Sequence, residues 1–257
     1  MRKSVEDFTY GSECVFRGMR IFYTRPKLWP YALPPILCVL LLYAGIMAAI
    51  FFFVVPWSQS WVQGLSFPDW LSWLHTVLNI CMTVILFLAG AFLMIICLGA
   101  VYEMFGGLLF DYLLEAFEKQ DFPGHPAADQ TIGRTICLSF GFVLYAIVSA
   151  LIMLLLLPLS FLIPVAGPIL FFLFSSIVYG VSYLSGSSIR QGAGIRTLKK
   201  QMAGKRFIVL GFGATANILL MIPFFILVLM PGLVIGGSIL YHTRLLDQIE
   251  YSGGKET

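Results

Sequence analysis

Residues 135–189 decide the fold of this protein: TICLSFGFVLYAIVSALIMLLLLPLSFLIPVAGPILFFLFSSIVYGVSYLSGSSI. The stretch runs for 55 residues without a charged side chain. A bilayer core of about 30 Å needs about 20 helical residues to cross, so this stretch is long enough for two passes. It lacks the strict alternation, in segments of about 10 residues, that marks the strands of a membrane barrel. The stretch therefore predicts a membrane hairpin built from α-helices.

The composition of the whole chain points the same way. Of the 257 residues, 59% are hydrophobic and 11% are charged, whereas a soluble domain carries about 25% charged residues. Three further apolar runs cover 28–68, 70–102 and 207–241; they contain no Asp, Glu, Lys or Arg, and their one histidine is His75. The sequence therefore predicts an all-α integral membrane protein with a single membrane domain over residues 1–257.

Lysine and arginine gather in two segments of the chain. Six lie in residues 1–27 and six in 184–206, while the segment 57–75 has none. Because cytoplasmic loops of membrane proteins carry the excess of positive charge, the N-terminus and 184–206 are expected on the cytoplasmic side of the membrane. The polar N-terminus, which holds acidic residues, does not resemble a cleavable signal peptide. The outer loop at 57–75 holds four of the five tryptophans, which suits a membrane interface.

Two ordinary crossings are expected in the first half of the chain. The first covers 33–55, entered through Pro34 and Pro35, and the second covers 76–102 and continues as a helix to Phe117. A polar link over 119–133 follows. This half of the chain is therefore predicted to form two long transmembrane helices.

Two hairpins broken by Pro and Gly are expected in the second half. The tip of the first is 158–168 (PLSFLIPVAGP), where only Ser160 is polar, and the break in the second is 223–232 (PFFILVLMPG), which has no polar side chain. Such a tip is better accommodated inside the apolar layer, provided that protein covers it. The legs of the second hairpin, 207–222 and 233–241, are too short to span about 30 Å at about 1.5 Å per residue. We therefore predict hairpins that enter the membrane partway, with six full crossings as the alternative.

Several motifs occur in the order and spacing seen in one known family. They are FRGMR (16–20), LPP (33–35), FGGLL followed by Asp111, IPVAG and PILFFLFS (163–175), and FGA, MIP, MP and GGS between 212 and 238. On these motifs the chain resembles the CysZ family of bacterial sulfate permeases, which is grouped with etoposide-induced-protein-like membrane proteins. The resemblance implies two long crossing helices with two partly inserted hairpins, a homo-oligomer, and sulfate uptake into the cytoplasm.

The chain also departs from the pattern of that family. Members close to the sulfate permeases carry Y-x-D-Y-P after the first hairpin, whereas Tyr183 is followed here by LSGSS. The family glutamate after GLL is Asp111. Two functions therefore stay open: a permease or channel for sulfate or a similar anion, and a non-transporting scaffold or bilayer-shaping protein of the same fold.

A candidate anion site lies in the N-terminal segment at Gly18, Met19 and Arg20. Sulfate is a dianion, so a protein holds it with positive charge and N–H donors. Arginine offers a planar fork of donors, and glycine lets an anion approach the backbone amides. The alternative is that Arg20 and its basic neighbours anchor the chain at the cytoplasmic interface.

A candidate gate lies at Asp111. A carboxylate repels sulfate, so it suits a pore only beside a cation, for which Arg134 and Arg196 are the candidates. The alternative is that Asp111 and the other acids of this helix are simply solvated. They are Glu103, Glu115 and Glu118. Asn217 is a rare polar residue of the last hairpin and is expected either to line a water path or to make interhelical hydrogen bonds.

No motif of an enzyme is present in the sequence. It lacks the phosphate-binding loop GxxxxGK[ST] and the zinc motif HExxH, and its cysteines and histidines lack metal-ligand spacing. We therefore expect neither catalysis nor a cofactor. The Gly-rich segment 186–194 is interpreted as a flexible basic loop at the membrane face, which can attract anionic lipid.

Overall fold

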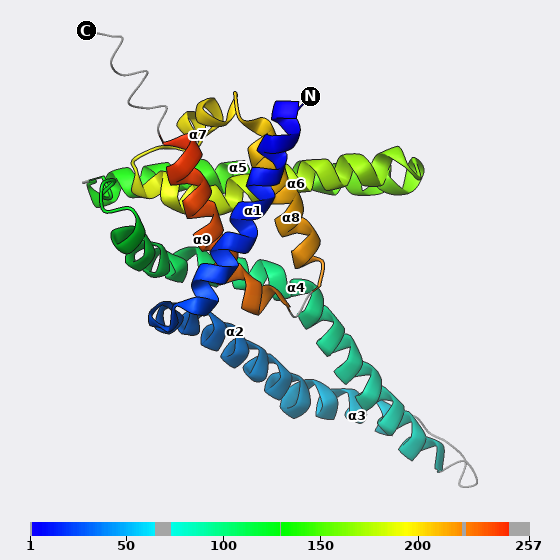
Figure 1. Ribbon diagram of the computed structural model, residues 1–257. Helices are drawn as coiled ribbons and strands as arrows, with labels where there is room; N and C mark the ends of the chain where they lie inside the picture. Colours follow the sequence, from blue (N-terminus) through cyan, green and yellow to red (C-terminus); the bar gives the residue numbers. More distant parts are fainter. Residues whose placement is uncertain (1, 65–72, 129, 223–224, 247–257) are drawn as a thin grey trace. The chain divides into compact units, whose positions relative to one another are not determined.

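The computed structural model describes residues 2–64, 73–128, 130–222 and 225–246, and within them every regular element is a helix (Figure 1). The elements are α1 (Arg2–Thr24), η1 (Pro26–Leu28), α2 (Trp29–Ala49), η2 (Ile50–Val54), α3 (Val55–Gln63), α4 (Trp73–Asp121), α5 (Ile132–Leu162), α6 (Ala166–Arg190), α7 (Ile195–Met202), α8 (Arg206–Leu220), α9 (Ile226–Leu240) and η5 (Tyr241–Leu245). Five spans in this part of the chain are long and apolar enough to cross a membrane. The prediction of an all-α integral membrane protein is confirmed.

The chain divides into two compact parts. One consists of Met1–Ala32 and Leu109–Thr257, and we call it the helical body. The other is Leu33–Leu108, which we call the long hairpin. A single membrane domain over residues 1–257 stays a prediction, because a division by compactness does not decide whether the two parts fold separately.

The first crossing of the long hairpin is longer than predicted. Its apolar span runs over Pro26–Val62, and Pro34 and Pro35 lie inside α2. The helix widens to a π-turn at Ile50–Val54, where the N–H of Val55 bonds to the carbonyl of Ile50. Pro56 follows in the first turn of α3, a position where its missing N–H disturbs little. The prolines therefore do not bound this crossing, because the helix accommodates each of them.

The second crossing agrees with the prediction of one helix that continues to Phe117. α4 is unbroken over 49 residues, from Trp73 to Asp121. Its span at Trp73–Met94 buries none of its residues, so its apolar side chains face the surroundings. Trp57 and Trp61, on α3, are likewise exposed, as expected for an interfacial belt. Trp73, the first residue of α4, is exposed as well, and the fourth tryptophan of that predicted belt, Trp70, lies outside the described residues.

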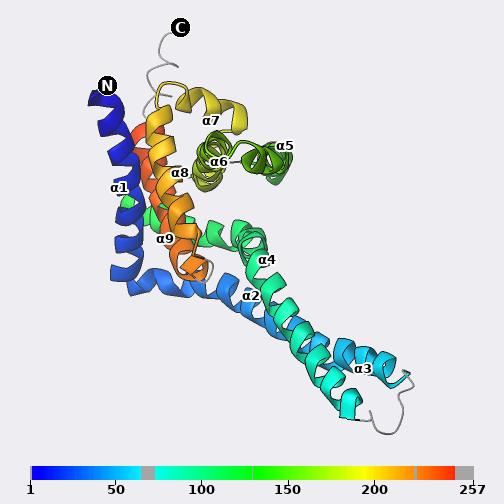
Figure 2. The same ribbon diagram turned by 90° about the vertical axis from the view of Figure 1, so that its right-hand side faces the viewer.

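In the helical body, α1, α8 and α9 lie side by side, and α6 crosses them with α5 on its outer side (Figures 1 and 2). α9 is central, since it contacts α1, α6 and α8, and 83% of its apolar span is buried. A helix that is apolar all round suits such a buried position. α5 is the opposite case, because most of its apolar side chains are exposed.

Glycine allows the helices of the body to approach one another closely. A methyl group on Gly18 of α1 would overlap the backbone of Gly232 and Gly236 on α9, and one on Gly213 of α8 would overlap the carbonyl of Ser176 on α6. Small residues at such positions are typical of helix contacts in membranes. These glycine contacts hold α1 close to α9 and α6 close to α8.

The first predicted hairpin is present as α5 and α6, joined by a short turn after Leu162. Leu162 and Val165, at the tip, are 80% and 72% exposed. The one polar side chain of the tip, Ser160, donates its hydroxyl to the carbonyl of Leu157 at 2.6 Å. The tip therefore offers an apolar surface to its surroundings.

The second hairpin differs from the prediction in where it breaks. α8 ends at Leu220 and α9 begins at Ile226, so Pro231 and Gly232 lie inside a helix. The second leg is therefore not the nine residues 233–241, because the apolar span at Ile226–Leu245 has 20 residues. The reason is tertiary: Gly232 packs against Met19 of α1, and neighbouring helices stabilise a proline-containing helix.

The two hairpins of the body run transverse to one another. α5 and α6 extend across the view in Figure 1 and are seen nearly end-on in Figure 2, where α8 and α9 still run vertically. Both pairs cannot lie along the normal of one flat bilayer. This arrangement favours partial insertion of at least one hairpin, which stays a prediction.

Cysteine labelling tests the insertion of the first hairpin. We expect Leu162→Cys and Val165→Cys to resist an impermeant maleimide in intact cells and to react after detergent is added. Both positions are exposed in the single chain, so their protection has to come from lipid or from a second copy of the chain. Gly64→Cys, exposed just after the first apolar span and within the predicted outer loop, is the control that should react from outside.

The background for this experiment removes Cys38, Cys81, Cys97 and Cys137. Cys14 can remain, because it is buried between helices and burial raises the pKa of its thiol to about 11, which leaves little reactive thiolate. Rapid labelling of both tip positions from outside would establish that the first hairpin crosses the membrane fully.

Candidate functional site

Glu118 of α4 lies inside the helical body with 4% of its surface exposed. Its Oε1 accepts hydrogen bonds from Ser187 Oγ of α6 at 2.7 Å and from Ser238 Oγ of α9 at 2.9 Å. Its Oε2 accepts a hydrogen bond from Nε of Arg190 at 2.9 Å. A buried carboxylate is tolerated when it is paired and hydrogen-bonded in this way. We call Glu118, Ser187, Arg190, Ser238 and His242 the Glu118 network.

Arg190 connects this buried acid to two exposed ones. It is the last residue of α6, and its side chain is 11% exposed. Nη1 donates to Oδ1 of Asp111 at 3.2 Å and lies 3.9 Å from Oε2 of Glu115. The side chain of Asp111 is 57% exposed. One guanidinium is therefore shared between a fixed partner inside the protein and a solvent-facing partner.

The spacing of the acids on α4 brings them to one side of Arg190. Residues three or four apart lie on the same face of a helix, which places Asp111, Glu115 and Glu118 in a row. Lys119 Nζ donates to Oε1 of Glu115 at 2.6 Å, and this hydrogen bond lowers the pKa of that carboxyl below its usual value. Glu115 therefore stays ionised at neutral pH beside Arg190.

His242 completes the network from the π-turn after α9. Its Nδ1 lies 3.0 Å from the carbonyl oxygen of Ser238, which can only accept, so Nδ1 carries a proton. The same nitrogen is 3.9 Å from Oε1 of Glu118. The ring stacks on Phe122 with 4.5 Å between ring centroids. His242 thus lies beside Oε1 of Glu118, whereas Arg190 bonds to Oε2.

A sharp turn after Arg190 ends α6 at the network. Ser188 and Ala193 exchange hydrogen bonds, each of 2.9 Å, across this turn. Gly192 has φ +74°, a conformation that glycine adopts without strain. The prediction of a flexible loop over 186–194 is wrong for residues up to Arg190, because contacts with Glu118 stabilise them as helix.

The cation beside Asp111 is Arg190, which corrects the expectation of Arg134 or Arg196. Arg134 lies in the first turn of α5 and Arg196 in α7, and both are exposed. Neither takes part in an ion pair among the described residues. The sequence could not select Arg190, because only the hairpin geometry returns the end of α6 to α4. The side chain of the fourth predicted acid, Glu103, lies outside the described residues.

The predicted anion site at Gly18, Met19 and Arg20 is split between two sides of α1. Gly18 is buried against Gly232 and Gly236, so its backbone is covered by α9 and not open to an anion. It also lies in the middle of α1, where backbone amides are used within the helix. Met19 is half-buried and Arg20 is exposed. The role given to Gly18 is therefore wrong, while Arg20 remains an accessible cation.

Asn217 makes interhelical hydrogen bonds. Its Nδ2 donates to Oγ of Ser175 at 2.7 Å and to Oγ of Ser176 at 3.3 Å, both on α6. The side chain is buried. Of the two expectations for Asn217, these contacts support a link between α8 and α6.

Sequence reasoning missed most of the Glu118 network. Two signals were present: the acids of α4 at helical spacing, and the Gly-Gly-Ser run at 236–238 that places a hydroxyl in an apolar helix. His242 carried no local signal, because its neighbours come from α4. Among the described residues no group of His, Cys, Asp and Glu could hold a metal ion. The arrangement is suited to charge pairing and to opening or closing a contact.

The chain is similar to known membrane proteins over most of its length. The family model described as Sulfate transporter CysZ/Etoposide-induced protein 2.4 matches residues 14–231. A protein named sulfate transporter CysZ from Vibrio parahaemolyticus is 22% identical over 225 residues, 87% of this chain and 90% of that protein. Proteins of the same name from Pectobacterium atrosepticum and Pseudomonas aeruginosa are 23% and 25% identical over 236 residues each; they cover 91% and 90% of this chain, and 85% and 94% of their own lengths. The resemblance inferred from the motifs is confirmed.

Proposed function

The chain belongs to the sulfate transporter CysZ/etoposide-induced protein 2.4 family, and from this membership we propose that it is a membrane permease for sulfate or a similar anion. The observation that carries the proposal is the match over residues 14–231, supported by relatives named sulfate transporter that align over most of their lengths. The apolar spans of the chain suit this role. The proposal includes no catalytic reaction.

We propose that the permease lies in a bacterial inner membrane with its N-terminus in the cytoplasm. The two segments rich in lysine and arginine, 1–27 and 184–206, support this orientation. We also propose a homo-oligomer. The broad exposed apolar surfaces of α5 offer area for a second copy as well as for lipid.

In this proposal Arg190 and Asp111 act as a replaceable contact. Glu118 holds Nε of Arg190 inside the body at 2.9 Å, while Asp111 meets Nη1 at the exposed side at 3.2 Å. An anion that arrives at this side would compete with Asp111 for the guanidinium. The arginine stays in place throughout, because its buried bond does not depend on Asp111.

Other predicted residues would contribute to the attraction of anions and to the packing of the helical body. Arg20, Arg134 and Arg196 are exposed cations that would raise the local concentration of anions. Asn217 would maintain the spacing of α8 and α6 through its bonds to Ser175 and Ser176. Electrostatic attraction of this kind weakens with salt.

Sulfate flux into liposomes tests the proposed function. Purified full-length protein should admit radiolabelled sulfate faster than protein-free liposomes, and unlabelled sulfate should compete better than chloride. Other anions in the same assay, among them phosphate, define the substrate. If no anion crosses, the permease is excluded and the scaffold of the same fold takes its place.

Removing the exposed acid tests the contact. Asp111→Asn is expected to raise the rate of sulfate flux up to about fivefold, since an exposed ion pair contributes about 0–1 kcal/mol. The effect should be non-additive with Arg190→Lys, because contacting residues couple by about 0.5–3 kcal/mol. Glu13→Gln, an exposed acid of α1, is the matched control and should leave the rate unchanged. Strict additivity would remove Asp111 from the mechanism.

A further inference from the structure

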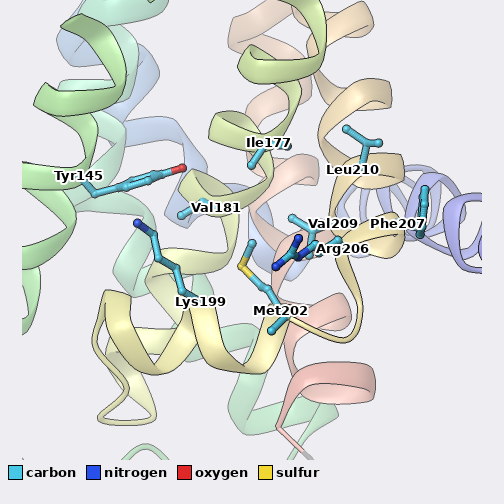
Figure 3. A pocket seen from close by; sticks show the side chains of 10 residues that line it. Tyr145, Ile177, Val181, Lys199, Met202, Arg206, Phe207, Val209 and Leu210 are labelled. Carbon is cyan, nitrogen blue, oxygen red and sulfur yellow. The ribbon is translucent and has the colours of Figure 1, made fainter. Parts of the chain in front are cut away.

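A pocket of about 410 Å³ opens in the helical body between α5, α6, α7 and α8, and none of the residues that line it belongs to the Glu118 network (Figure 3). Its volume falls within the range of about 300–1,000 Å³ that is usual for sites of small molecules and cofactors. Tyr145 of α5 stands at one side and Phe207 of α8 at the other (Figure 3). The residues that line it all belong to the helical body.

Most of the wall of this pocket is apolar. The floor is formed by Val181 and Val209, each 1% exposed, and by Met202. Towards the mouth, Ile177 and Phe207 are 41% and 51% exposed. The pocket therefore continues an apolar surface of the protein into its interior, which suits a hydrocarbon chain.

The charged groups of the wall are both positive. They are Lys199 of α7 and Arg206, the first residue of α8. Nζ of Lys199 lies 4.7 Å from the centroid of the Tyr145 ring, and this cation–π contact holds it at the pocket. The described residues that line the pocket include no carboxylate. The site is thus cationic at its polar end and apolar elsewhere.

We propose that this pocket binds an anionic phospholipid. Lys199 and Arg206 hold the phosphate of the head group, and an acyl chain lies against Ile177, Phe207 and the floor. Free sulfate or phosphate fits poorly, because a small hydrated dianion would lose water against the apolar wall. The pocket also belongs to the basic segment expected at the cytoplasmic face, where anionic lipids are concentrated.

Native mass spectrometry of the intact protein tests the site. The protein is reconstituted with equal amounts of phosphatidylglycerol and phosphatidylcholine, extracted in mild detergent, and the retained lipids are counted. The wild type should retain phosphatidylglycerol preferentially. The double variant Lys199→Gln with Arg206→Gln should lower that retention about 25-fold, because each cation near an anionic lipid surface contributes a factor of about five.

Two further experiments distinguish lipid binding in the pocket from general attraction between charges and from binding of a free anion. Arg17→Gln with Lys200→Gln removes the same charge from exposed positions outside the pocket and should retain phosphatidylglycerol like the wild type. Inorganic phosphate and glycerol 3-phosphate, which lack acyl chains, should not displace the lipid. Equal loss in both double variants, displacement by the soluble phosphates, or no preference in the wild type would each overturn the proposal.

Discussion

Replacing Arg190 by methionine is expected to lower the free energy of unfolding by about 3–5 kcal/mol, because it leaves the buried carboxylate of Glu118 without a cation. Ser187 and Ser238 would still donate to Oε1, but Oε2 would lose the hydrogen bond from Nε. Methionine keeps much of the volume of the side chain, so the loss reflects charge more than packing. Thermal unfolding of the purified protein in detergent measures it.

Two matched variants distinguish the contribution of the buried ion pair to stability from that of the exposed ion pair. Asp111→Asn removes the exposed partner of the same arginine and should cost about 0–1 kcal/mol. Glu118→Gln combined with Arg190→Met removes both buried charges and should recover much of the stability, since replacing a whole buried pair is often nearly neutral. Near wild-type stability of the single Arg190→Met variant would show that Glu118 does not depend on this cation.

Replacing Gly18 by valine is expected to destabilise the helical body by about 3 kcal/mol or more. The new Cβ would overlap the backbone of Gly232 and Gly236, which cannot move aside as a side chain can. α1 and α9 would have to separate, and overpacking of this kind costs about 1–3 kcal/mol and occasionally more. Thermal unfolding and the yield of protein in the membrane measure the loss.

Gly45→Ala is the matched control for this glycine. Gly45 also lies within a helix, but no atom lies within 4 Å of the position where its Cβ would stand. Alanine should be neutral or slightly stabilising there, because glycine in a helix costs about 1 kcal/mol relative to alanine. Equal tolerance at positions 18 and 45 would contradict the close contact of α1 and α9.

The amino-acid sequence by itself determined the class of this protein and the existence of its main elements. Backbone groups without partners are too costly in hydrocarbon, so a bilayer admits helices or a closed barrel, and uncharged runs such as 135–189 lack the alternation of barrel strands. The same argument predicted the turn between α5 and α6, where the sole polar side chain, Ser160, binds its own helix. The continuation of α4 beyond the membrane followed from its uninterrupted helical pattern. These features are local, so local chemistry sufficed for them.

Only the tertiary structure decided which polar residues meet. Glu118 looked like one of several acids at a helix end, and His242 like an isolated histidine. They form one network because the ends of α6 and α9 return to α4 and supply Ser187, Arg190 and Ser238. Proline and glycine were misleading for the same reason. Pro231 and Gly232 lie inside α9, and do not break it, because α1 packs against the helix at Gly232. Burial and pairing depend on elements far apart in the chain, and the spacing of residues along the sequence does not encode which of those elements come together.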